Sequence, residues 1–272
     1  KTTDVFEKIV LKDKLISSEV LFVWDIEEIP ESEYSIWMST NQGLICYNPK
    51  QNSGKKIKLP VLKNESEVSF SILNTEEDYV LVSSHESIYK VSKKENKLQP
   101  PIPLFPVINK TLIQKIINFN DHILIATEGE GLFSFNTKTK AVSKLHIGAK
   151  KDPLNISIWD LYVTNNILWI GTNQGLHRMD TNDMEIKPTA ITNHIIYSIN
   201  EDHQDKLWLG SEKGLLSYDI HTEKIRIYNE EETIKNFEFN RKSVLKTDDN
   251  KLWFGGTNGI TVFDPKTIKS NP

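Results

Sequence analysis

The sequence predicts an all-β protein, a β-propeller of six four-stranded blades, and three observations carry this prediction. A short motif rich in tryptophan and glycine recurs along the 272 residues. Each copy has the composition of two β-strands joined by a tight turn. The copies also follow one another at nearly constant intervals, as repeat architectures do. The interval is 39 to 45 residues, measured at one turn position that holds Gly43, Ser87, Gly131, Gly175, Gly214 and Gly259.

The motif is not equally clear in all six copies. The three clearest copies, LWIGTNQGLHRMD, LWLGSEKGLLSYD and LWFGGTNGITVFD, occupy residues 168–180, 207–219 and 252–264. A fourth copy, IWMSTNQGLICYN, covers residues 36–48. Two weaker copies cover residues 80–92 and 124–136, and the second of these has one extra residue in its turn.

Each copy supplies two neighbouring strands. The first is a continuous apolar run, such as residues 168–170, which suits a strand covered on both faces. A polar turn with glycine follows, because glycine tolerates the backbone geometry of tight hairpins. The next strand alternates, so that Leu176 and Met179 are expected on opposite faces of the sheet.

Two further strands flank each pair. Looser strands are expected after the pair at residues 56–59, 142–145 and 224–228, and further strands before it at residues 20–24, 156–159 and 195–199. Four strands in roughly 40–45 residues is the size of a propeller blade. A single blade cannot bury both of its faces, so blades must pack against one another around an axis.

Tryptophan recurs at the same place in four copies, as Trp37, Trp169, Trp208 and Trp253. We expect these side chains to lie between neighbouring blades, where each aromatic ring buries on the order of 150–250 Å². A helical solenoid has a similar period, but the Asn, Asp, Thr, Ile and Val at these positions disfavour helix.

The two ends of the chain predict how the blades close. The last copy stops after its third strand, at Asp264 and Pro265, and residues 5–10 resemble an outer strand without a blade of its own. We therefore expect the N-terminal strand to complete the last blade and close a six-bladed ring. A seven-bladed ring and an open part-ring are the alternatives. Residues 1–272 are interpreted as a single propeller domain, a fragment of a larger multidomain protein.

Composition restricts the possible partners. The net charge is −4 and the pI is about 6.0, without the basic face typical of nucleic-acid binding, so no nucleic acid is expected. No apolar run reaches the roughly 18 residues of a membrane span, so no membrane contact is expected from this fragment. Cys46 is the only cysteine, which excludes an intrachain disulfide. Its place in a predicted strand favours a small buried side chain over a nucleophile.

The pattern [LI]W[ILF]G[TS]xxG[LI]xx[YMF]D resembles the regulator-propeller repeat in the periplasmic sensor region of hybrid two-component histidine kinases of the Bacteroidetes type. Residues 236–241, 252–259 and 263–265 resemble the last blade of such a sensor, just before an immunoglobulin-like domain. Propellers of this family typically have seven blades, one more than the copies counted here. The ligand contacts of the family are not part of the repeat, so the resemblance assigns no binding residue.

This resemblance implies an extracytoplasmic, periplasmic part of an inner-membrane receptor that senses a ligand and is not itself an enzyme. The implied signal is carbohydrate-derived, with an oligosaccharide as the ligand and no cofactor. In the parent protein, immunoglobulin-like and histidine kinase domains would act in cis, and the receptor could form a homodimer.

The candidate ligand site follows from the predicted architecture. In a propeller, the turns between second and third strands and the segments that enter the innermost strands line one face. The candidates on this face are Asn41, Gln42, His85, Glu86, Glu128, Glu130, Asn155, Trp159, Asn173, Gln174, His194, Tyr197, Asn240, Arg241 and Asn258. Amides and carboxylates bond hydroxyl groups, while Trp24, Trp159, Tyr197 and Phe239 could stack on a sugar. The competing interpretation is that asparagine is present because turns favour it.

Two other functions remain open. The chain could be a non-catalytic scaffold propeller that binds proteins or its own dimer mate, which a contiguous apolar surface patch would favour. The blade also resembles that of the streptogramin lyases, for which His85, Glu86, Glu128, Glu130 and His194 would be the candidates. The histidines show no metalloprotease spacing, and the glycine-rich segment 254–259 lacks the Lys and helix of a phosphate loop. Neither a catalytic residue nor a metal ligand is assigned.

Overall fold

The structure is a computed structural model that describes residues 21–60, 67–85, 87–104, 107–108, 111–146, 156–180, 185–228 and 238–268. Nearly all regular structure in these ranges is β-strand. The chain divides into two compact units, Lys1–Ile102 (the first unit) and Pro103–Pro272 (the second unit).

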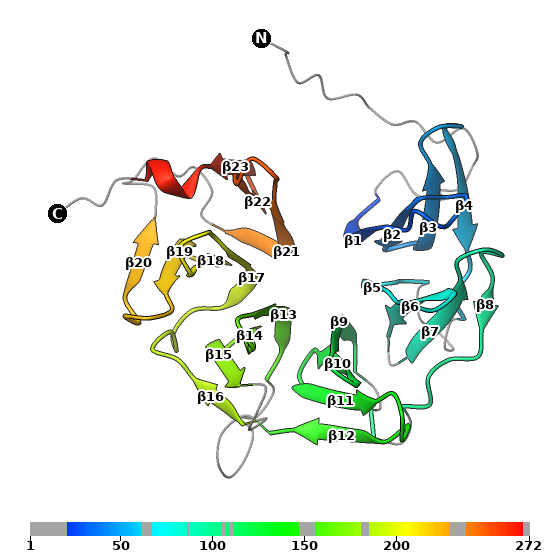
Figure 1. Ribbon diagram of the computed structural model, residues 1–272, viewed down its shortest axis with the longest axis horizontal. Coiled ribbons are helices and arrows are strands. Elements are labelled where there is room, and N and C mark those ends of the chain that lie inside the picture. Colours follow the sequence, from blue (N-terminus) through cyan, green and yellow to red (C-terminus); the bar gives the residue numbers. More distant parts are fainter. Residues whose placement is uncertain are drawn as a thin grey trace. The chain divides into compact units, whose positions relative to one another are not determined.

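The first unit contains two antiparallel four-stranded sheets, blade 1 and blade 2 (Figure 1). Blade 1 consists of β1 (Val23–Glu28), β2 (Ile36–Thr40), β3 (Gly43–Asn48) and β4 (Ser53–Ile57), and blade 2 of β5 (Ser71–Asn74), β6 (Tyr79–Ser84), β7 (Ser87–Ser92) and β8 (Leu98–Gln99). Each strand pairs with the next one along the chain.

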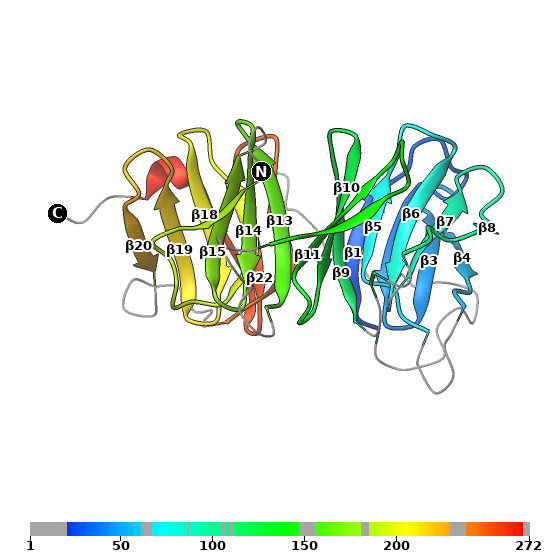
Figure 2. The same ribbon diagram turned by 90° about the horizontal axis from the view of Figure 1, so that it is seen from below.

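The second unit contains four sheets, blades 3 to 6. Blade 3 consists of β9 (Ile113–Phe119), β10 (His122–Thr127), β11 (Leu132–Asn136) and β12 (Val142–Leu145), and blade 4 of β13 (Ile158–Thr164), β14 (Ile167–Thr172), β15 (Gly175–Asp180) and β16 (Ile186–Pro188). Blade 5 consists of β17 (Ile196–Glu201), β18 (Lys206–Ser211), β19 (Gly214–Asp219) and β20 (Ile225–Tyr228), and blade 6 of β21 (Phe239–Lys246), β22 (Leu252–Gly256) and β23 (Gly259–Phe263), followed by the 3-10 helix η2 (Pro265–Thr267). Figure 2 shows β13, β14 and β15 of blade 4 running side by side.

The predicted fold class is confirmed: the chain is an all-β protein of antiparallel β-propeller blades. Within the described ranges, five sheets have four strands and blade 6 has three. The N-terminal strand predicted at residues 5–10 to complete the last blade lies outside the described residues. Closure of the ring and the single-domain organisation of residues 1–272 stay predictions.

The first strand of each blade is called its innermost strand, and two of these strands extend further than predicted. Where the sequence predicts strands ending at residues 24 and 159, β1 continues to Glu28 and β13 to Thr164. The predicted strands stop before the first charged residue, which is Asp25 in β1 and Asp160 in β13. Both carboxylates accept backbone N–H groups of the following blade, so they fit within a strand.

A hydroxyl group explains the [TS]xxG part of the repeat. In blade 4 the Thr172 hydroxyl donates to the carbonyl oxygen of Gly175 at 2.9 Å and accepts the N–H of Gln174 at 2.9 Å. The same pair of bonds forms around Thr40 in blade 1 and Ser211 in blade 5. A short polar side chain thus satisfies the backbone of each tight turn.

Close approach of backbones explains the glycines of the repeat. Gly175 has a φ of +110°, and a Cβ added there would lie 2.0 Å from the carbonyl oxygen of Ile191. At Gly171, which follows the tryptophan strand motif, an added Cβ would lie 2.9 Å from the carbonyl oxygen of Ile196 in blade 5. Glycine at this position lets the next innermost strand pack directly on the tryptophan strand.

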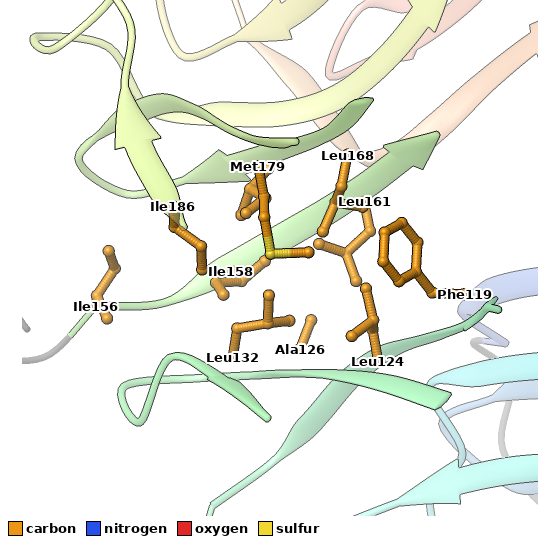
Figure 3. Close-up of a cluster of buried hydrophobic side chains, with 11 residues drawn as sticks. Phe119, Leu124, Ala126, Leu132, Ile156, Ile158, Leu161, Leu168, Met179 and Ile186 are labelled. Carbon is orange, nitrogen blue, oxygen red and sulfur yellow. The ribbon is translucent and has the colours of Figure 1, made fainter. Parts of the chain in front are cut away.

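The cores lie between neighbouring blades. Figure 3 shows one of them, in which Leu124 and Leu132 of blade 3 face Leu168 and Met179 of blade 4. Trp169 packs between blades 4 and 5, and Trp208 between blades 5 and 6. Trp37 is buried likewise between blades 1 and 2. The predicted position of the tryptophans is therefore confirmed for these three rings, and Trp253 is only partly buried.

Cys46 belongs to the core between blades 1 and 2 and is fully buried. Burial raises the pKa of its thiol well above its usual range. The thiolate, which is the reactive form, is strongly disfavoured there. The expectation of a small core side chain is confirmed.

Candidate functional site

Four of the innermost strands, β1, β9, β13 and β17, carry one extra residue at the same place, close to where the strand begins. The pairing with the second strand skips Trp24 in β1, Gln114 in β9, Trp159 in β13 and Tyr197 in β17. Such β-bulges re-aim a side chain out of the regular alternation of a strand. The bulge residues therefore form a repeated set on the innermost strands, next to the turns that the sequence predicts as a ligand face.

Blade 6 has a larger bulge. Four residues, Asn240 to Ser243, lie opposite the single Gly255 between the paired positions Phe239 and Val244. Lys242 adopts a φ of 55°, a left-handed conformation that is uncommon for a residue with a side chain. The extra length projects Arg241 and Lys242 toward the other innermost strands of the second unit.

In blades 1 and 4 an aspartate directly follows the bulge residue and bonds to the next blade. Asp160, directly after Trp159, accepts the N–H of Ile199 at 2.8 Å and the Lys115 ammonium at 2.5 Å. Its side chain is 2% exposed, whereas that of Lys115 is 24% exposed. Asp25 has the same place in blade 1 and accepts the N–H of Ile72 at 3.0 Å and the Ser71 hydroxyl at 2.9 Å. These bonds connect blades 3, 4 and 5 in the second unit and blades 1 and 2 in the first.

A first group of candidates in the second unit gathers around Arg241. Its guanidinium lies 3.5 Å above the centre of the Trp159 ring, within the range of a cation–π contact. The same guanidinium is 3.9 Å from the Glu128 carboxylate. That carboxylate also accepts the Gln114 amide at 2.8 Å, and Lys242 donates to the Gln114 carbonyl oxygen at 2.9 Å. Three predicted residues, Glu128, Trp159 and Arg241, are thus brought together.

A second group lines an open pocket of about 530 Å³ formed by Asn173, Gln174, Thr192, Asn193, His194, Ile195 and Glu212. The Glu212 carboxylate accepts the N–H of Ile195 at 2.7 Å and lies 3.8 Å from Nδ1 of His194. Asn173 accepts the N–H of Ser157 at 2.9 Å, which fixes its amide at the entrance to blade 4. The pocket offers amide, imidazole and carboxylate groups to a polar ligand.

Tyr197 electrostatically links the two groups. Burial raises the pKa of its phenol, the negative charges of Glu238 and Glu212 raise it too, and the positive charge of Arg241 lowers it. An ordinary tyrosine phenol is neutral near pH 7, and these causes leave Tyr197 a hydrogen-bonding group. Charges of the Arg241 group and of the Glu212 pocket therefore both act on this bulge residue.

In the first unit, four aromatic rings form a continuous row. Phe22 stacks on Trp24 at 5.8 Å, Trp24 lies 6.3 Å from Phe70, and Phe70 lies 6.3 Å from His85. Asn41 accepts the N–H of Phe22 at 2.8 Å, which ties the predicted turn to the row. Trp24 is 36% and Phe22 54% exposed, so part of the row is open to solvent.

The remaining candidates differ in how exposed they are. Gln42 is buried at 7% exposure. Glu130, Asn240 and Asn258 are exposed, and Glu130 has Lys144 at 3.9 Å. Glu86 and Asn155 lie outside the described residues. The expectation that Phe239 belongs to the face is wrong, because its ring is 1% exposed and packs in the core between blades 5 and 6.

Gln114, Phe22 and Phe70 were missed by the sequence prediction. Gln114 is neither aromatic nor in a turn, and the copies were aligned on the tryptophan strands instead of the innermost strands. The dipeptide Trp-Asp at 24–25 and again at 159–160 is the signal that could have aligned them. From that alignment the bulge positions of blades 1 and 4 follow.

The lyase candidates form no metal site in the described part of the chain. Among these residues, no three His, Cys, Asp or Glu side chains gather closely enough to hold a metal ion. The carboxylate beside His194 is that of Glu212, which was not among the candidates for this chemistry.

Away from the face, Glu201 is a buried acid, 9% exposed, that accepts the Thr164 hydroxyl at 2.6 Å. Its other oxygen has no hydrogen bond to any residue that the structure describes. Burial raises the pKa of its carboxyl, the Thr164 hydroxyl lowers it, and Asp205 raises it.

Glu201→Gln is expected to stabilise the protein at neutral pH. The carboxyl holds its proton more tightly in the native protein than in the unfolded chain. Its contribution to stability is therefore complete below the pKa of the unfolded state and is lost as pH rises through the native pKa. Glutamine removes that loss and still accepts the Thr164 hydroxyl. Thermal unfolding should show a higher Tm for the variant at pH 7.5 and a smaller difference at pH 4.5. A variant that unfolds at a lower temperature at pH 7.5 would contradict this.

No protein-family model matches the chain. It is similar to the histidine kinase P4 of Formosa agariphila, at 31% identity over 88 residues, 32% of this chain and 6% of that protein. The structure is similar to the extracellular domain described as that of the hybrid two-component system BT4673 of B. thetaiotaomicron, with a TM-score of 0.73, 18% identity and coverage of 93% of this chain and 33% of the other. The extracellular domain described for BT3049 of B. thetaiotaomicron gives a TM-score of 0.69, 17% identity and coverage of 92% and 35%.

These likenesses confirm the resemblance that the repeat predicts. The solved neighbours are extracellular domains of hybrid two-component systems, and the curated relative is a histidine kinase. At these identities the structures show a common fold. The chain spans about a third of the length of the solved chains and 6% of the curated relative. Within the described ranges, no helix has the length and apolar composition that crossing a membrane requires.

Proposed function

We propose that this chain is the periplasmic, ligand-sensing propeller of a two-component receptor, and that it recognises a carbohydrate-derived signal. One observation carries the proposal: the bulges place Trp24, Trp159 and Tyr197 at the same step of three innermost strands, beside turns that carry amides and carboxylates. The similarity to extracellular domains of hybrid two-component systems supports the sensing role.

The chemistry of both units suits a polyhydroxylated ligand. In the first unit the stacked pair Phe22 and Trp24 offers an open aromatic surface on which the apolar face of a sugar ring can lie. In the second unit, Asn173, His194 and Glu212 offer donors and acceptors for hydroxyl groups. Sites that combine apolar walls with a few oriented polar groups are typical of small-molecule recognition.

A signal requires that the ligand bind two arrangements of the receptor with different affinity. The inter-blade bonds of Asp25 and Asp160 favour a rigid platform within each unit. We therefore place the conformational change between modules, with immunoglobulin-like and kinase domains of the parent protein acting in cis. In this proposal the propeller itself performs no catalysis.

Trp24→Ala in the complete ectodomain is expected to weaken binding of a glycan selected on an array by about 5- to 30-fold. A ring that anchors a ligand contributes on the order of 1–2 kcal/mol when truncated. Calorimetry measures the change, and Ile225→Ala, an exposed residue of the outer strand β20, is the matched control that should bind like the wild type. If neither the array nor calorimetry shows any glycan bound to the ectodomain, the carbohydrate part of the proposal is wrong.

A scaffold or dimerisation function is the second candidate, and a specific observation favours it. Leu245, Ile260 and Val262 of blade 6 are 58%, 61% and 41% exposed, and Leu245 and Val262 flank Trp253 in the sheet register. The corresponding face of blade 5 is covered by blade 6. Crosslinking of the full receptor separates the two functions, because Ile260→Asp should abolish a dimer that uses this face and leave glycan binding unchanged.

A further inference from the structure

Trp159 and Trp24 occupy equivalent bulges, yet their rings differ in access. Trp24 is 36% exposed, whereas Trp159 is 5% exposed. In the second unit the ring face that a sugar would contact already carries a group, the Arg241 guanidinium at 3.5 Å. The predicted stacking role of Trp159 therefore conflicts with the contact seen in the structure.

The segment that delivers Arg241 is built differently from the other bulges. It contains four residues, 240–243, where β9, β13 and β17 have one. Its far end is fixed by Lys242, which donates to the carbonyl oxygen of Gln114 on β9 at 2.9 Å. The φ of 55° at Lys242 costs more for a lysine than for glycine, so the segment is held by its contacts and not by its own preference.

A second position for the guanidinium lies beside the first. The Glu128 carboxylate is 3.9 Å from Arg241, too far for a hydrogen bond, and Gln114 keeps one of its oxygens in place at 2.8 Å. The Arg241 side chain is 40% exposed and the Glu128 side chain 38%, so both can move without opening the core. A shift toward Glu128 would replace a cation–π contact by a charge-assisted hydrogen bond.

We propose that residues 240–243 form a strap that closes a second stacking position on Trp159, and that a ligand gains this position by displacing Arg241 toward Glu128. The inference rests on the proposed function for the role of the ligand, but the closure itself is independent of it. Because a closed fraction lowers apparent affinity, Arg241 sets how tightly the second unit binds. Removing the Arg241 side chain should therefore strengthen ligand binding, whereas removing a residue that contacts the ligand would weaken it.

The closure can be tested without a ligand. The probe is N-bromosuccinimide, which oxidises accessible indole rings, and peptide mass spectrometry locates the oxidised tryptophan. In the 272-residue chain Trp159 should be protected, and Arg241→Ala should make it reactive. Arg226→Ala is the matched control, because it removes a cation–π contact of 4.8 Å with Tyr228 on blade 5. Arg241→Gln, which keeps a polar side chain, should give the same result as alanine.

The ligand is tested on an array of neutral and acidic oligosaccharides with the complete ectodomain. The ligand no longer has to break the cation–π contact over Trp159 when Arg241 is removed. We therefore expect the Arg241→Ala protein to bind the glycan about 2- to 30-fold more tightly. If Trp159 stays protected in a folded Arg241→Ala protein, the strap is not its cover and the inference is overturned. Weaker binding by the variant overturns it too, because Arg241 would then contact the glycan. If Trp159 becomes reactive but no protein binds any glycan, the closure stands and the proposed carbohydrate function fails.

Discussion

Asp160→Ala is expected to destabilise the second unit by about 3–5 kcal/mol, the usual cost of removing one partner of a buried ion pair. Three donors lose their acceptor at once: the Lys115 ammonium, the N–H of Ile199 and the N–H of Leu161. Because Lys115 is only 24% exposed, water replaces the lost carboxylate poorly. Urea unfolding monitored by circular dichroism measures the change in the free energy of unfolding.

Asp25→Ala is the matched control for this prediction. Asp25 has the same place in blade 1 and also accepts donors of the next blade, a hydroxyl and a backbone N–H, but no lysine side chain bonds to it in the described residues. Its loss should cost about 1–2 kcal/mol, because it leaves uncharged donors, and no ammonium group, without their acceptor. Equal losses for the two variants would show that the Lys115 pair contributes nothing beyond the shared hydrogen bonds.

Trp208→Ala is expected to cost about 3–5 kcal/mol, as large-to-small substitutions of core aromatics do. The ring is 2% exposed and packs against Tyr228 at 5.3 Å and Phe263 at 4.7 Å. Its indole N–H donates to the buried Asp202 carboxylate at 2.8 Å. Alanine therefore leaves both a cavity between blades 5 and 6 and a buried carboxylate without this donor. Thermal unfolding should show a large drop in Tm.

Trp253→Ala provides the comparison within the same repeat position. Trp253 is only partly buried, and in the described residues its indole N–H has no hydrogen-bond partner. We expect it to cost less than half of the Trp208 loss, since the hydrophobic contribution scales with the apolar area buried. A loss as large as that of Trp208→Ala would mean that this ring is covered as completely as the others.

Much of the fold could be predicted because each blade repeats the same local chemistry. The tryptophan, the glycine beside it and the hydroxyl-x-x-glycine turn each have a structural cause, and they recur wherever a blade needs that contact. Thr172 and Gly175 illustrate this, because residues close together in the sequence determine the hydrogen bond and the glycine conformation of their turn.

The candidate site was harder to predict because it depends on contacts between distant segments. Arg241 and Trp159 were both on the predicted face, but nothing in either local sequence indicates that one lies on the other. The four-residue bulge that makes this contact occurs in blade 6 and departs from the repeat. A prediction from the repeat contains only the features that the blades share, so it does not include this bulge. Gln114 was missed for a related reason, since its role comes from its register and not from its residue type.

Hydrogen–deuterium exchange on the complete ectodomain tests the central claim, that in each unit the bulges and adjoining turns of the innermost strands contact the ligand. With an array-selected glycan, exchange should slow in peptides that contain Trp24, Gln114, Trp159, Tyr197 or Arg241, and stay unchanged in the outer strands β4, β12 and β20. Protection confined to those outer strands, with the bulge peptides unaffected, would contradict the account.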